Sequence, residues 1–157
     1  MERSKRRGMS FGATSGVITP LGLLIGLISS TSSKLAVIGG ILTIAITDSL
    51  ADALGMHISE ESLGESKKQI WNSSKYVFLA KFFLALSFII PVLIFNSLLV
   101  VGITSSIWGI SLIIWFSFNI AKKNNESSIL VIGEHLLLVI LVIGLTYGVG
   151  LLVNRFF

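Results

Sequence analysis

The sequence predicts an all-α integral membrane protein: a bundle of five transmembrane helices in one domain that covers residues 1–157. Hydrophobic residues make up 53% of the chain and charged residues only 13%, and the mean hydropathy is +0.89. This composition offers too little polar surface to cover a water-soluble globule. The apolar runs are also long enough, because a helix needs roughly 20 residues to cross a hydrocarbon core.

Each predicted span is an apolar run bounded by polar residues, glycine or a turn. The spans cover residues 11–30, 35–58, 76–98, 104–121 and 129–153. A tight turn at residues 31–34 joins the first two, and the polar stretch SEESLGESKKQIWNSSK separates this pair from the third. Between the third and fourth spans the chain stays apolar, and only Val100, Gly102 and residues 104–106 indicate a turn.

Basic residues predict which way the bundle points, because cytoplasmic loops are enriched in lysine and arginine. Only Lys34 and Arg155 fall on one side of the predicted spans. The basic residues on the other side are Arg3, Lys5, Arg6, Arg7, Lys67, Lys68, Lys75, Lys122 and Lys123. We therefore expect a cytoplasmic amino terminus and a carboxyl terminus outside or in a lumen. The basic N-terminal residues followed by an apolar run could alternatively be a cleaved signal peptide. However, this apolar run is long and has no A-x-A-like cleavage site.

The formal net charge of +4 does not indicate a nucleic-acid partner, because the basic residues flank apolar runs and are not interleaved with exposed aromatics. The chain contains no cysteine, which excludes disulfides and thiolate metal sites. The expected partners are the lipid bilayer and the ions that cross it.

The second span carries the most informative pattern. Asp48, Asp52 and Met56 recur every fourth residue within LAVIGGILTIAITDSLADALGMHI, so they share one helix face. Charge near hydrocarbon is costly unless a partner, water or an ion compensates it, and this predicts a cation pathway. The alternatives are neutral acids bonded to hydroxyls and a methionine that only packs. Lys81 is expected to snorkel to the headgroups, with pairing to one of these acids as the alternative.

The predicted topology places polar groups from the first, second and fifth spans in one layer near the cytoplasm. The expected metal ligands are Asp48, Asp52, Met56 and Glu134, with Ser15, Thr19, His57 and His135 as accessory groups. Glu60, Glu61 and Glu65 would gather cations at the cytoplasmic mouth, although acids in a connector are commonly just solvated.

Small residues and prolines predict how the helices pack. Pro20 and Pro91 each remove one backbone hydrogen bond and are expected to bend their helices. Glycine pairs at four-residue spacing let helix backbones approach closely within one subunit or between two. These pairs are Gly12 and Gly16, Gly22 and Gly26, and Gly144 and Gly148.

Four blocks resemble, in order, those of the vacuolar iron transporter family. They read FGATSGVITPLGLLIGL, ALGMHISEES, IIPVLIF and GEHLLLVILVIGLTYGVG. The resemblance implies five transmembrane helices, a homodimer, and export of ferrous iron or manganese from the cytoplasm in exchange for protons. It also implies a path near the dimer axis, lined by the first and second helices.

The chain departs from the family pattern at the ligand positions. The family typically carries an aspartate in a first-helix block like G-A-N-D-G, where this chain has Ser15 in GATSG. Asp52 aligns with the family's methionine in the second helix, and Met56 aligns with its glutamate. The long glutamate-rich cytoplasmic helices are absent, so the chain resembles a small member without the cytoplasmic metal-binding domain. The acid is therefore expected from the second helix.

These observations predict a transporter of a divalent metal cation, Fe²⁺ or Mn²⁺, with proton-coupled export from the cytoplasm. Ligation needs deprotonated carboxylates, so protons and metal compete for one site. The alternatives are a non-transporting accessory or structural membrane protein, and a transporter of another cation or a small solute. No permanently bound cofactor is expected, and the chain is expected to be a multi-pass membrane protein, in the plasma membrane if its source is a prokaryote. No enzyme motif is recognisable.

Overall fold

The computed structural model describes residues 3–157, and within that range every regular element is a helix. The helices are α1 (Arg3–Thr31), α2 (Lys34–Ser62), α3 (Lys67–Ser87), α4 (Ile89–Ile94), α5 (Leu98–Asn124) and α6 (Ser128–Phe156). Counting α3 and α4 as one segment, five helices are long and apolar enough to cross a membrane. The predicted all-α class and the five spans are confirmed at this level, and the architecture is consistent with a multi-pass membrane protein.

The boundary between the third and fourth spans differs from the prediction. The turn lies at residues 95–97, and the hydroxyl residues that indicated a later turn lie inside α5. The Thr104 hydroxyl donates to the Val100 carbonyl at 2.7 Å, and the Ser106 hydroxyl donates to the Gly102 carbonyl at 2.8 Å. Such back-bonding satisfies a hydroxyl within the helix, so these residues did not need a loop.

The polar connector between the second and third spans is also mostly helical. α2 continues to Ser62 and α3 begins at Lys67, which leaves only residues 63–66 between them. Ser66 and Gln69 form a capping box at the start of α3, which satisfies backbone donors that the first turn leaves free.

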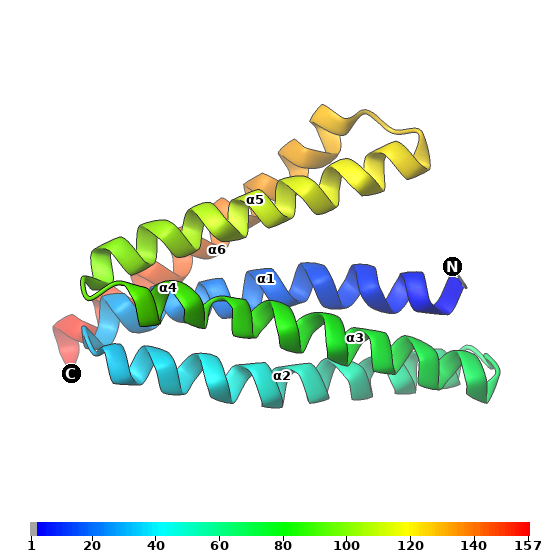
Figure 1. Cartoon of the computed structure of the whole chain (residues 1–157), viewed down its shortest axis with the longest axis horizontal. Helices are drawn as coiled ribbons and strands as arrows, with labels where there is room; N and C mark the ends of the chain where they lie inside the picture. The colour runs from blue at the N-terminus through cyan, green and yellow to red at the C-terminus, as the bar shows by residue number, and fades with distance from the viewer. Residues whose placement is uncertain (1–2) are drawn as a thin grey trace.

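α1 is the central helix of the bundle. It packs against α2, α3, α5 and α6. Of the residues in its most apolar 18-residue stretch, 50% are buried, compared with 11% in the corresponding stretch of α6. Figure 1 shows α1, α2 and α3 side by side, with the α5–α6 hairpin on the other side of α1. The hairpin diverges from α1 toward the end where the N-terminus lies, and the C-terminus lies at the opposite end (Figure 1).

The buried core forms where α1 meets its neighbours. Its members are Val17, Leu21, Leu24, Ile25, Val37, Ile41, Phe88, Val92, Val101, Ile113 and Val139. Large apolar side chains such as Leu35, Leu99 and Ile129 remain more than two-thirds exposed. In a chain with five apolar helices, these outward residues are the surface that a bilayer would cover.

Glycines set the closest helix contacts, as predicted for two of the three pairs. A Cβ built at Gly12 would lie 2.6 Å from the Val77 carbonyl oxygen of α3, and one built at Gly22 would lie 2.9 Å from Val142 of α6. Gly144 and Gly148 have no neighbouring atom within 4 Å of such a Cβ. That third pair therefore makes no close approach within the chain, because α6 turns those residues outward.

The two prolines behave differently. Pro91 lies in α4, just after α3 ends at Ser87, and it has no N–H with which to continue the helical hydrogen bonds. Phe88 at this break donates its N–H to the Ala85 carbonyl at 3.2 Å. Pro20, in contrast, lies inside α1, which is assigned as one continuous helix.

Candidate functional site

A buried lysine joins the two aspartates of α2. Lys81 of α3 is 1% exposed, and its Nζ lies 2.5 Å from Oδ2 of Asp48 and also pairs with Oδ2 of Asp52. Asp48 and Asp52 are one helical turn apart, so one ammonium reaches both. The expected snorkelling of Lys81 is therefore wrong: the lysine points into the bundle, where two opposite charges compensate its burial.

The first helix contributes a hydroxyl to the same cluster. Oγ of Ser15 donates a hydrogen bond to Oδ2 of Asp52 at 2.7 Å. Three helices thus meet at one carboxylate, and we refer to Ser15, Asp48, Asp52 and Lys81 as the Asp–Lys cluster. Ser15 is the residue that replaces the acid expected from the family resemblance, and it still lies beside an acid.

The charges of the Asp–Lys cluster do not balance. When all three groups are ionised, two carboxylates face one ammonium, and one negative charge is in excess. Oδ2 of Asp48 is buried and accepts no hydrogen bond from residues 3–157, despite its short distance to Lys81. An excess charge among apolar helices is costly unless a partner, water or an ion compensates it.

The two carboxylates of the Asp–Lys cluster are less buried than its lysine. The side chains of Asp48 and Asp52 are 26% and 23% exposed, whereas that of Lys81 is 2% exposed. The lysine therefore closes the inner side of the cluster, and the carboxylates have a partly open outer side.

The predicted contribution of the last helix is not brought to this cluster. Glu134 is exposed on α6, and Nδ1 of His135 lies 2.8 Å from the hydroxyl of Ser117 on α5. Among residues 3–157, no group of three or more His, Asp or Glu side chains is positioned to hold a metal ion. The expected layer of converging ligands is thus reduced to the two aspartates and the residues next to them.

The remaining candidates on α1 and α2 lie around the cluster. Met56 and Thr19 are half-buried, one turn beyond Asp52 and Ser15 respectively. His57 is held by α3: its Nδ1 lies 3.5 Å from the Ser74 hydroxyl, and its ring meets that of Trp71 edge-on at 4.8 Å. No hydrogen bond joins His57 to the aspartates.

The three acids that were predicted to lie at the cytoplasmic mouth, Glu60, Glu61 and Glu65, have three different environments. Glu60 is 1% exposed and forms an ion pair with Arg7 of α1. Glu65 is half-buried, with Oε1 3.7 Å from Nη2 of Arg7, and Glu61 is exposed. Glu60 therefore fastens the start of α1 to the end of α2, and Glu61 is the most accessible of the three.

Comparisons with protein-family models, with curated proteins and with solved structures find no match to this chain. The likeness to the vacuolar iron transporter family therefore depends on the four sequence blocks alone.

Proposed function

We propose that this chain transports a divalent cation across a membrane, with Fe²⁺ or Mn²⁺ as cargo, and that Asp48 and Asp52 form the exchange site. The single observation that carries the proposal is the shared ion pair of these two aspartates with the buried Lys81. It supplies two carboxylates at one point of an apolar bundle, together with a positive charge that a cargo ion must displace.

The charge balance of the Asp–Lys cluster sets how many protons would be exchanged for each metal ion. With Lys81 protonated, the cluster needs one further proton to become neutral. With a divalent cation on both carboxylates, the cluster is neutral only when Lys81 has released its proton. Each metal ion therefore replaces two protons, and neither state leaves a net charge among apolar side chains.

The ligand types favour a transition metal over calcium as cargo. Two carboxylates and the Ser15 hydroxyl offer fewer oxygens than the six to eight that calcium takes. Met56, one turn from Asp52 along α2, would add a softer thioether contact suited to Fe²⁺. The sequence resemblance favours the same cargo.

Orientation and assembly are part of the proposal. Most basic residues belong to the start of α1, the start of α3 and the end of α5. These helix ends lie at the end of the bundle that holds the N-terminus (Figure 1), which the positive-inside rule would make cytoplasmic. A homodimer through α2 is supported by an exposed stripe of small residues at four-residue spacing. The stripe consists of Gly39, Thr43, Thr47, Ala51 and Gly55. A two-fold axis along it would bring a second pair of aspartates near the first.

Transport into proteoliposomes tests the proposal. We expect the parent protein to carry Mn²⁺ or Fe²⁺ to an enclosed metal-sensitive dye, faster when an opposing proton gradient is imposed. Asp52→Asn should abolish the uptake, and Glu126→Gln, which neutralises an exposed acid outside the cluster, should retain it. Absence of uptake by the parent under either gradient would overturn the proposal, and uptake of Na⁺ alone would indicate a different cargo.

A second function, a non-transporting membrane protein, is favoured by one observation: Lys81 already neutralises part of the acidic charge without any metal. Thermal unfolding separates the two. If the cluster binds cargo, Mn²⁺ raises the unfolding temperature of the parent but not that of Asp52→Asn. If the cluster is only structural, Mn²⁺ shifts neither protein.

A further inference from the structure

A groove between α1 and α5 combines an apolar interior with a basic mouth. Its interior, about 240 Å³, is lined by Ala13 of α1 and by Trp115, Phe116 and Ile120 of α5, among others. A second hollow of about 270 Å³ continues it toward the end of the bundle and shares four of its residues. The shared residues are Arg6, Ser10, Ile120 and Lys123.

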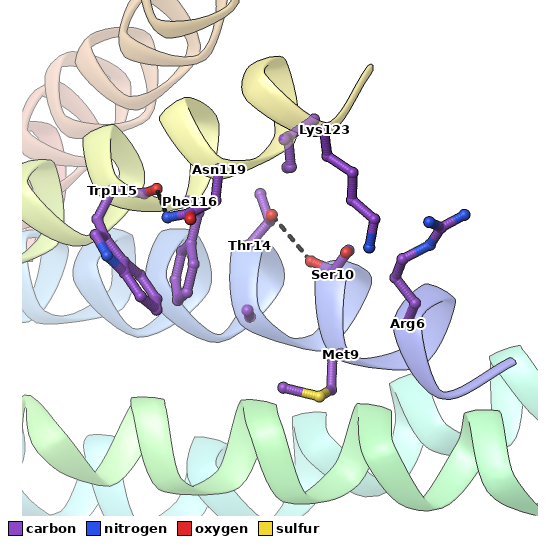
Figure 2. Close-up of a pocket in the computed structure, with 10 residues that line it drawn as sticks. Arg6, Met9, Ser10, Thr14, Trp115, Phe116, Asn119 and Lys123 are labelled. Atoms are coloured by element: carbon purple, nitrogen blue, oxygen red, sulfur yellow. Dashed lines mark hydrogen bonds between the residues drawn. The ribbon is translucent and has the colours of Figure 1, made fainter. Parts of the chain in front are cut away.

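Three cations at the mouth have no ion-pair partner within the described part of the chain. Arg3, Arg6 and Lys123 line the outer hollow and form no ion pair or hydrogen bond with residues 3–157, whereas Arg7 is neutralised by Glu60. Among residues 3–157, no acidic side chain lines either hollow. Figure 2 shows Arg6 of α1 and Lys123 of α5 extending toward the same gap, with Trp115 and Phe116 further along α5.

We propose that this groove binds an anionic phospholipid, with its phosphate held by Arg3, Arg6 and Lys123 and an acyl chain against Trp115 and Phe116. Charge complementarity selects the headgroup, because converging cations without acids attract a phosphate and disfavour a zwitterion's ammonium. The apolar interior selects a lipid over free phosphate, which would leave the aromatic lining uncovered.

The position of the groove agrees with a lipid ligand. The residues that line the groove belong to the first part of α1 and the last part of α5, which carry Arg3, Arg6 and Lys123. Figure 1 shows these parts of the two helices at the end where the N-terminus lies and where the hairpin diverges from α1. Trp115 is 61% exposed beside it, so the interior opens sideways toward the surroundings of the helices. A lipid can enter from the bilayer with its headgroup at the interface, where tryptophan and basic side chains are favoured.

Quenching of Trp115 by brominated lipid tests the site in the full-length protein. The parent and Trp115→Phe are reconstituted in vesicles that contain either brominated phosphatidylglycerol or brominated phosphatidylcholine. The difference between the two proteins isolates the emission of Trp115 from that of Trp71 and Trp108. We expect phosphatidylglycerol to quench this component at a lower mole fraction than phosphatidylcholine does.

Charge variants separate a built site from general surface attraction. Arg6→Gln combined with Lys123→Gln should reduce the preference for phosphatidylglycerol at least about fivefold, the factor expected for one interfacial cation. Lys67→Gln combined with Lys68→Gln removes the same charge from exposed positions on α3 and should leave the preference unchanged. Equal quenching by the two lipids in the parent, or equal loss in both double variants, would overturn the proposal.

Discussion

Gly16 of α1 lies directly against the backbone of Lys81 of α3. A Cβ built at Gly16 would stand 2.8 Å from the Lys81 Cα and 3.1 Å from its carbonyl oxygen. The missing side chain thus lets α3 approach α1 at the level where the lysine turns toward the aspartates. One glycine therefore helps to set where the ammonium lies.

Replacing that glycine should disturb the bundle. We expect Gly16→Ala to lower stability by about 1–3 kcal/mol, because a backbone contact cannot yield as a flexible side chain does. The measurement is thermal unfolding in detergent. Gly148→Ala is the matched control, since its Cβ would meet nothing within 4 Å and its unfolding temperature should not fall. An equal drop in the two variants would contradict the proposed close contact.

Removing the positive charge of Lys81 should destabilise the protein, because the two aspartates would lose their counter-ion. Lys81→Met leaves two carboxylates without a counter-ion, and we expect a loss of up to about 3–5 kcal/mol in unfolding free energy. Adding Asp48→Asn and Asp52→Asn to the same protein should recover most of that loss, because no uncompensated charge remains. If the triple variant is less stable than Lys81→Met, the lysine matters through packing and not through charge.

Restoring an acid on the first helix should strengthen cation binding. Ser15 already touches Asp52, so Ser15→Asp places a third carboxylate at the cluster. We expect Mn²⁺ to bind at least about tenfold more tightly, since an added charge at this distance contributes more than 1.4 kcal/mol in a protein environment. Calorimetric titration measures this, with Ser15→Asn as the uncharged control of the same shape. Equal affinities in Ser15→Asp and Ser15→Asn would argue against metal at the cluster.

The ion pair between Arg7 and Glu60 should matter more than its place near the chain end implies. Arg7→Gln leaves the 1% exposed Glu60 without its cation, and we expect a loss of about 1–3 kcal/mol. Arg6 is an exposed neighbour that forms no ion pair with residues 3–157, and Arg6→Gln should change stability by no more than about 0.5 kcal/mol. Thermal unfolding of both variants at one salt concentration checks this prediction.

The number and type of helices could be predicted because span length is a strong signal. A run of apolar residues long enough to cross a bilayer has few other structures open to it. The ends of the helices were harder to predict. Thr104 and Ser106 suggested a turn, but their hydroxyls bond to carbonyls of their own helix, and the sequence does not distinguish these two cases. The helices also extend beyond the predicted spans, because polar ends such as residues 59–62 can be helical outside hydrocarbon.

The candidate site was predicted only in part, because sequence gives depth along a helix and not its rotation. Asp48 and Asp52 share a face, as their spacing requires, but nothing in the sequence shows that Glu134 points outward. One feature of the sequence indicates that Lys81 faces the first helix. Gly8, Gly12 and Gly16 repeat at the same spacing as Ser73, Val77 and Lys81, which they contact in that order.

Every polar atom of the Asp–Lys cluster precedes the connection at residues 95–97. Ser15, Asp48, Asp52 and Lys81 all belong to the first three membrane-length segments, and the α5–α6 hairpin supplies none of them. A break in the gene at that connection would leave Ser15, Asp48, Asp52 and Lys81 together on one polypeptide. The hairpin would then form a second chain, and it would have to rejoin the first to bury Val101, Ile113 and Val139 in the shared core.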